Sequence, residues 1–183
     1  MGGRRPRVRL SIATFIPKPH TPFQWERQIN VAEIDERQRT ILARLRVKGI
    51  EASWHDARQT TLEGVLSRGD RRLGQVICRA AAGGARFDNW SEQFRWQEWE
   101  NAFASTGLDF REFLRERGED EVLPWDVIDV GVRKAFLLTE RRRAYQGQRT
   151  PDCRTDCVAC GVAAAAGGNG VCPARQVALL VPS

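Results

Sequence analysis

Two short segments near the start of the chain alternate apolar and polar residues, which is the pattern of a β-strand. In residues 8–15, Val8, Leu10 and Ile12 share one face, and the alternation stops at residues 16–22, which hold three prolines. In residues 50–54, Ile, Ala and Trp alternate with polar residues in the same way. The pattern therefore predicts two strands.

A helix is predicted between these strands. Asn30 stands three residues before Glu33, the spacing of a capping box, and Gly49 ends the helix after about Lys48. The apolar residues of one helical face are Ile34, Ile41, Leu42 and Leu45. A strand, a helix of this length and a second strand form a βαβ unit, whose strands are parallel.

The following residues, 59–146, carry the pattern of several short helices. Helix starts are predicted near Thr60, Asp70, Asn89 and Asp109, and a last helix with Ile128, Val132 and Phe136 on its inward face ends at residues 141–143. The helix that follows Asp70 runs to about Ala82 and carries Cys78, which we expect to be buried as a small apolar residue. We expect Trp96 and Trp99, one helical turn apart, to pack in the core.

These elements predict an α+β fold that is mainly helical. We divide it into a basic terminus (1–7), a strand-helix-strand unit (8–58), a helical region (59–146) and a Cys-rich tail with an Ala/Gly insertion (147–183). The longest apolar clusters are interrupted by charges, and the terminus lacks the apolar core of a signal peptide. We therefore expect no membrane partner and a cytoplasmic location.

The net charge of +6 is concentrated at the start of the chain, where Arg4, Arg5, Arg7 and Arg9 supply four positive charges. The rest of the sequence is close to neutral. A nucleic-acid-binding arm and a solvated terminus are both compatible with this distribution, so nucleic acid stays open as a partner.

The tail holds four of the five cysteines. Cys153, Cys157 and Cys160 form a C-x3-C-x2-C array, and Cys172 offers a fourth ligand beyond the insertion. Because disulfides are rare in a reducing compartment, clustered thiols there indicate metal ligation. Small residues at Ala159 and Gly161 permit the backbone to wrap around one centre. Iron-sulfur clusters and structural zinc both accept four cysteines, and we favour an iron-sulfur cluster with zinc as the alternative.

Several phrases, in order along residues 8–173, resemble the C-terminal region of the cobalamin-binding radical S-adenosylmethionine (radical SAM) proteins. They are Ser11–Trp25, Trp54–Asp56, Leu62–Leu73, Phe87–Trp90, Leu123–Asp126 and Asp152–Arg154. The resemblance implies that the βαβ unit is the end of a TIM-like barrel, that the helices form an accessory region and that the Cys tail is a second metal site. It also implies that His20, His55 and Asp56 lie at the barrel mouth and contact cofactor or substrate.

The cobalamin-binding domain and the barrel strands with their own three-cysteine motif precede this region in the family. The chain has neither, so we expect a truncated or split-gene product that needs a separate chain with these domains before it can use S-adenosylmethionine and cobalamin. Whether the isolated chain is an enzyme is left open.

Two further alternatives stay open at this point. Arg71, at a predicted helix start, either binds an anionic group or is solvated, and His55 with Asp56 either contacts a ligand or forms a hydrogen-bonded corner that starts a helix. The chain as a whole is an iron-sulfur accessory part, a zinc-binding module that binds RNA or protein without catalysis, or a non-functional gene fragment.

Overall fold

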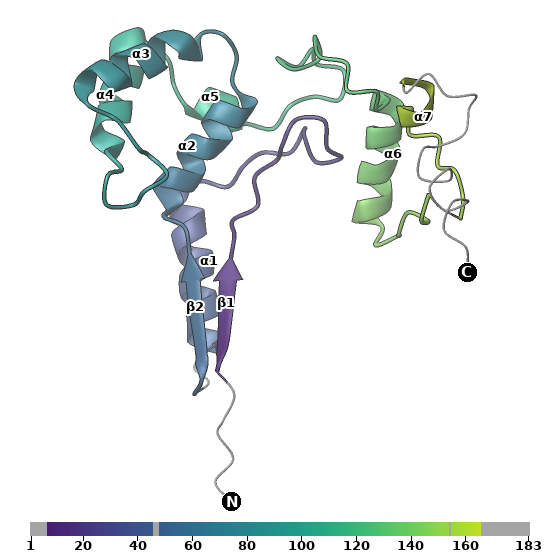
Figure 1. Ribbon diagram of the computed structural model, residues 1–183, viewed down its shortest axis with the longest axis horizontal. Coiled ribbons are helices and arrows are strands. Elements are labelled where there is room, and N and C mark those ends of the chain that lie inside the picture. Colours follow the sequence, from purple (N-terminus) through teal and green to yellow (C-terminus); the bar gives the residue numbers. More distant parts are fainter. Residues whose placement is uncertain (1–6, 46–47, 154, 166–183) are drawn as a thin grey trace, which may run out of the picture. The chain divides into compact units, whose positions relative to one another are not determined.

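The computed structural model describes residues 7–45, 48–153 and 155–165. The described chain forms two compact units (Figure 1). The first comprises residues 7–17 and 27–116, and the second comprises residues 18–26 and 117–165. The fold is α+β and mainly helical, as the sequence predicts.

The first unit begins with the expected βαβ arrangement. Strands β1 (Val8–Ile12) and β2 (Ile50–Trp54) are parallel, with Val8 opposite Ile50 and Ile12 opposite Trp54, and helix α1 (Val31–Arg44) connects them. Both predicted strands and their direction are confirmed. The first strand is shorter than residues 8–15, because its pairing with β2 ends at Ile12 and Trp54.

Helix α1 starts as its capping box predicts. The Asn30 side chain accepts a hydrogen bond from the Glu33 backbone N–H, and the Glu33 carboxylate accepts one from the Asn30 N–H. Its buried face centres on Ile34, while Leu42 is exposed. The helix ends at Arg44 with Leu45 as its C-cap, earlier than the predicted Lys48.

Four further helices complete the first unit, namely α2 (Ala57–Arg68), α3 (Leu73–Gly83), α4 (Trp96–Thr106) and α5 (Arg111–Leu114). Figure 1 shows them beyond the carboxyl ends of the two strands, while α1 runs beside the strands. Their apolar faces form one core that includes Val65, Val76, Trp99 and Phe113. Trp96 packs against this core, so the predicted packing role of both tryptophans is confirmed.

The helix starts in this unit differ from several predictions. Helix α2 begins at Ala57, capped by Asp56, and not at Thr60. The Asp70 carboxylate accepts a bond from the Arg72 N–H in a turn, so it precedes α3 without capping it. Residues 88–93 form turns, and α4 starts at Trp96 and not near Asn89.

The prediction for Cys78 is wrong, because its side chain is exposed. Helix α3 buries Leu73, Val76 and Ala80, which lie three and four residues apart on one face. Cys78 follows Val76 by two residues and therefore lies on a different face of the helix.

The second unit contains helix α6 (Lys134–Tyr145), the short helix α7 (Val162–Ala165) and several turns. Its core consists of Trp25, Leu123, Trp125 and Leu137, with Val132 and Phe136 packed against it. The predicted continuous helix from Ile128 is wrong. Ile128 is exposed, and Gly131 has a positive φ of 74°, which a helix does not allow. No helix of the described residues is long and apolar enough to cross a membrane.

Candidate functional site

The three described cysteines of the tail lie on a loop of the second unit. Cys153 and Cys160 are half-buried and Cys157 is exposed, and none of the three forms a disulfide with another described residue. Hydrogen bonds to the Asp152 carbonyl from the Thr155 and Asp156 N–H groups form a tight turn between the first two cysteines. Cys172 lies outside the described residues.

The backbone around Cys160 takes a conformation that most residues avoid. Ala159 has a φ of 54° and Gly161 a φ of 110°, so both neighbours of Cys160 lie in the left-handed region. The sequence singled out these two small residues as the ones that permit the chain to wrap. In the structure, these two positions have the left-handed backbone on either side of Cys160.

This loop is held against the segment that precedes α6. The Arg133 N–H donates to the Cys160 carbonyl over 2.8 Å. A Cβ atom on Gly161 would lie 2.5 Å from the Gly131 carbonyl oxygen and 2.8 Å from Cγ of Arg133, closer than real contacts allow. Only glycine therefore fits at this point of contact.

The donor chemistry of the loop suits a thiophilic metal centre, since thiolates bind both iron-sulfur clusters and zinc. In the described part of the chain, however, no three His, Cys, Asp or Glu side chains converge closely enough to hold an ion. The three thiols thus supply suitable ligands and a sharply turned backbone, without a preformed ligand cage among them.

A second candidate region lies at the carboxyl end of β2. His55 is exposed, and the Asp56 carboxylate accepts hydrogen bonds from the N–H groups of Arg58 and Gln59 at 2.8 and 3.2 Å. Asp56 is therefore the N-cap of α2. The hydrogen-bonded corner that the sequence analysis left open is present, and it starts a helix.

His55 also lines a hollow of about 290 Å³. Its polar lining includes Glu63, Asp88 and Asn89, and Leu62 and Leu66 supply apolar surface. Asp56 lines a different hollow of about 560 Å³, together with Ser91, Phe94 and Arg95 among others. His55 and Asp56, adjacent in sequence, thus face two different hollows.

Gln59 belongs to both hollows and was not predicted as a site residue. Its amide Nε2 donates to the Asp88 carbonyl at 2.9 Å, and its Oε1 accepts from the Ser91 hydroxyl at 3.3 Å. Gln59 therefore fixes the loop between α3 and α4 against the first turn of α2. A single glutamine in a helix start carries no sequence signal for this role.

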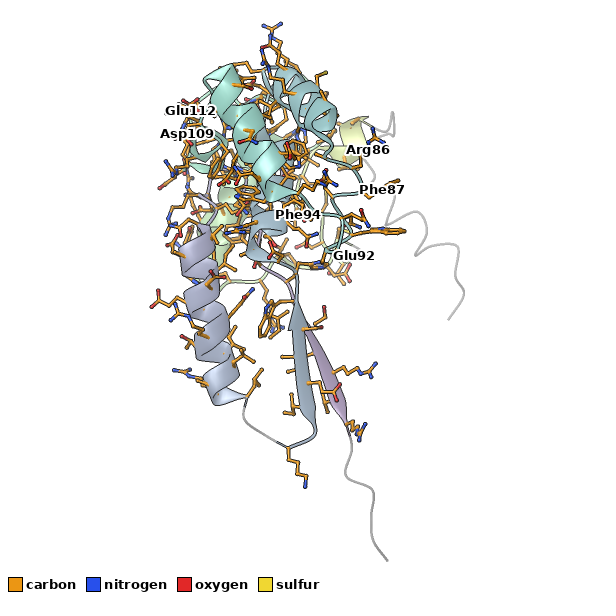
Figure 2. The ribbon with its side chains drawn as sticks, turned by 90° about the vertical axis from the view of Figure 1, so that its left-hand side faces the viewer. Arg86, Phe87, Glu92, Phe94, Asp109 and Glu112 are labelled. Carbon is orange, nitrogen blue, oxygen red and sulfur yellow. The ribbon has the colours of Figure 1, made fainter. Side chains whose placement is uncertain are left out.

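The same loop exposes two aromatic side chains. Phe87 has a φ of 56°, a strained value for a bulky residue. The Phe87 side chain is 70% exposed and the Trp90 side chain 60% exposed. The centroids of their two rings lie 5.9 Å apart. Figure 2 shows Arg86 and Phe87 on the side of the first unit opposite Asp109 and Glu112. The phrase Phe87–Trp90 contributes to the family resemblance, but nothing in its composition indicates the strained backbone.

The remaining predicted site residues differ in their surroundings. His20 belongs to the second unit, is half-buried and has a φ of 56°, and its N–H donates to Oε1 of Gln24 at 2.9 Å. Arg71 is exposed in the turn before α3. His20 thus lies in one unit of the chain, and His55, Asp56 and Arg71 lie in the other.

Comparison with protein-family models, curated proteins and solved structures found no match to this chain.

Proposed function

We propose that this chain is the C-terminal part of a radical SAM iron-sulfur protein and carries an accessory metal site on its Cys tail. The observation that carries the proposal is the loop around Cys160. It places three thiols within eight residues and gives both neighbours of the last one a positive φ. The sequence resemblance supplies the class of protein.

Cys153, Cys157 and Cys160 would hold the metal, with Cys172 as the expected fourth ligand. Metal sites of this kind often form only when the metal binds, because the cysteines lose their protons and take up their final arrangement on binding. The Arg133 N–H, bonded to the Cys160 carbonyl, anchors the last of the three cysteines. A bound cluster would supply electron transfer or a structural cross-link in the tail.

The βαβ unit supports the same proposal. One face of the strands is half-buried and carries Leu10 and Ala52, and the other is exposed and polar, with an Arg9–Glu51 ion pair at 3.4 Å. A strand with an apolar face toward a helix suits the wall of an α/β barrel, whose helices cover the outside of the strands. In this proposal the chain acts together with a separate chain that supplies the cobalamin-binding domain and the cluster that binds S-adenosylmethionine.

Metal analysis after anaerobic purification tests the proposal. We expect iron and acid-labile sulfide with visible charge-transfer absorption, lost in Cys157→Ala and retained in the control Cys78→Ala, whose exposed thiol lies in the first unit. Zinc alone would favour the alternative of a zinc-binding interaction module. Absence of metal from the wild-type chain after reconstitution with iron and sulfide would contradict both.

A further inference from the structure

The two-stranded sheet has open edges. Among the described residues, β1 and β2 pair only with each other, so each strand has one side without a neighbouring strand. Parallel sheets are normally wider than two strands and covered on both faces, and two strands alone are marginally stable. The sheet therefore presents backbone groups that a further strand can satisfy.

The outer edge of β1 can be assigned residue by residue. The Val8 N–H donates to the Gly49 carbonyl at 2.8 Å, so Val8 turns its backbone groups toward β2. In a parallel ladder alternate residues bond to opposite sides. Arg9 and Ser11 therefore turn their N–H and C=O groups away from β2, toward the open side of the sheet.

An apolar groove lies between the carboxyl end of β1 and helix α1. It has a volume of about 340 Å³ and is lined by residues at the end of β1, including Ile12, and by Ile34, Gln38 and Ile41 of α1. None of its described lining residues comes from β2. Part of the apolar face of α1 thus lies beside β1, where it can cover the side chains of an added strand. This favours the β1 edge over the β2 edge.

The charge of the groove indicates what kind of strand it accepts. Arg27 and Arg37 line it, and no carboxylate belongs to its described lining. Arg27 forms two hydrogen bonds with Glu33, at 2.9 and 2.7 Å, and Arg37, which is exposed on α1, interacts with Glu33 only electrostatically. A complementary segment has aliphatic side chains at alternate positions, toward α1, and a carboxylate near Arg37.

We propose that the outer edge of β1 is a strand-addition site, at which an extended, aliphatic segment of a second polypeptide with an acidic end pairs with Arg9 and Ser11 and covers the groove of α1. Main-chain hydrogen bonds supply affinity and the alternate side chains supply specificity. The inference rests on the proposed function in one respect, namely that the chain binds a second polypeptide. The strand-addition site itself involves no metal.

The experiment measures binding of a dye-labelled decapeptide, four Val-Thr pairs followed by two Glu, to the full chain by fluorescence anisotropy. Ser11→Pro removes an N–H that faces the open edge, a position where an edge strand tolerates proline. Ala52→Pro is the matched control, since its N–H faces the outer edge of β2. We expect Ser11→Pro to weaken binding at least about tenfold and Ala52→Pro to change it less than about twofold.

A peptide methylated on the backbone nitrogens of alternate residues provides a test that leaves the chain unaltered. Methylation of the residues that face β1 should abolish binding, and methylation of the others should not. Equal effects of the two proline variants, equal binding of both methylated peptides, or no binding of the parent peptide would overturn the proposal. Dimerisation of the chain without peptide, lost in Ser11→Pro, would show that a second copy occupies the edge and would also overturn it. Failure of the peptide to bind would not change the interpretation of the metal analysis, and absence of metal would not change the interpretation of peptide binding.

Discussion

Arg68 shows how one side chain joins three segments of the first unit. It is 0% exposed, and its guanidinium donates to the carbonyls of Phe113, Pro17 and Arg115 at 3.1, 3.2 and 2.9 Å. The planar fork of Arg reaches several acceptors at once, which a lysine ammonium cannot do. Arg68 therefore fixes the end of α2 to the chain after β1 and to the end of α5.

We expect Arg68→Lys to destabilise the chain by about 3 kcal/mol, because buried carbonyls lose charge-assisted hydrogen bonds. Denaturant unfolding followed by circular dichroism measures this change. The control Arg71→Lys, at an exposed site three residues away, should shift the free energy of unfolding by less than about 0.5 kcal/mol. Similar values for the two variants would show that the Arg68 bonds are not required for stability.

At the scale of the element, α1 depends on charges at its first turn. The hydrogen bonds from Arg27, and then the bond from the Asn30 backbone, lower the pKa of Glu33 to about 2 from an ordinary value of 4.5. A carboxyl group whose pKa is lower in the folded chain stabilises the fold above its unfolded pKa. This contribution is lost as the pH falls from about 4.5 to about 2.

Glu33→Gln should therefore flatten the dependence of stability on pH between about 4.5 and 2. Gln keeps the geometry of the capping box but has no charge for Arg27. Thermal unfolding at a series of pH values compares the variant with the wild type. Glu36→Gln, on the same helix and exposed, is the control. A slope unchanged in Glu33→Gln would contradict the role assigned to the Arg27–Glu33 pair.

At the scale of the whole molecule, each unit joins segments that are distant in sequence. In the second unit, Oε1 of Gln24 accepts from Nε1 of Trp125 at 2.7 Å, and Arg141 forms ion pairs with Glu26 and Glu119 at 2.7 Å each. The Pro-rich loop after β1 is thus built into the unit that carries the Cys tail. The contact of Gly161 with Gly131 and Arg133 joins the tail to this unit.

Gly161→Ala should destabilise the second unit by about 2 kcal/mol or more, because the added Cβ meets the Gly131 carbonyl at a positive φ. Gly147→Ala is the matched control, since Gly147 also has a positive φ but nothing within 4 Å, and it should cost about 1 kcal/mol. Amide hydrogen exchange at residues 131–133 and 160–161 measures the difference. Equal protection in both variants would mean that the contact does not hold the tail.

The sequence by itself determined the features that depend on neighbouring residues. The alternation at residues 8–12 and 50–54, the Asn30–Glu33 capping box and the length of the connecting helix predicted the parallel βαβ unit. The short helix after Asp109 was likewise predicted, although Asp109 accepts from the Arg111 N–H in the turn before the helix and does not cap it. These signals are local, since a cap or a strand period acts over a few residues.

Only the tertiary structure decided which side chains are buried and where the candidate sites lie. Cys78 and Ile128 have the apolar character of core residues but are exposed, whereas Arg68 has a full charge and is buried. His55 and Asp56 are adjacent in sequence yet line different hollows. Gln59, which lines both hollows, holds the loop between α3 and α4 through its hydrogen bonds with Asp88 and Ser91. The reason is physical: burial and hydrogen-bond partners depend on residues 29 to 51 positions away in these examples, which local sequence patterns do not encode.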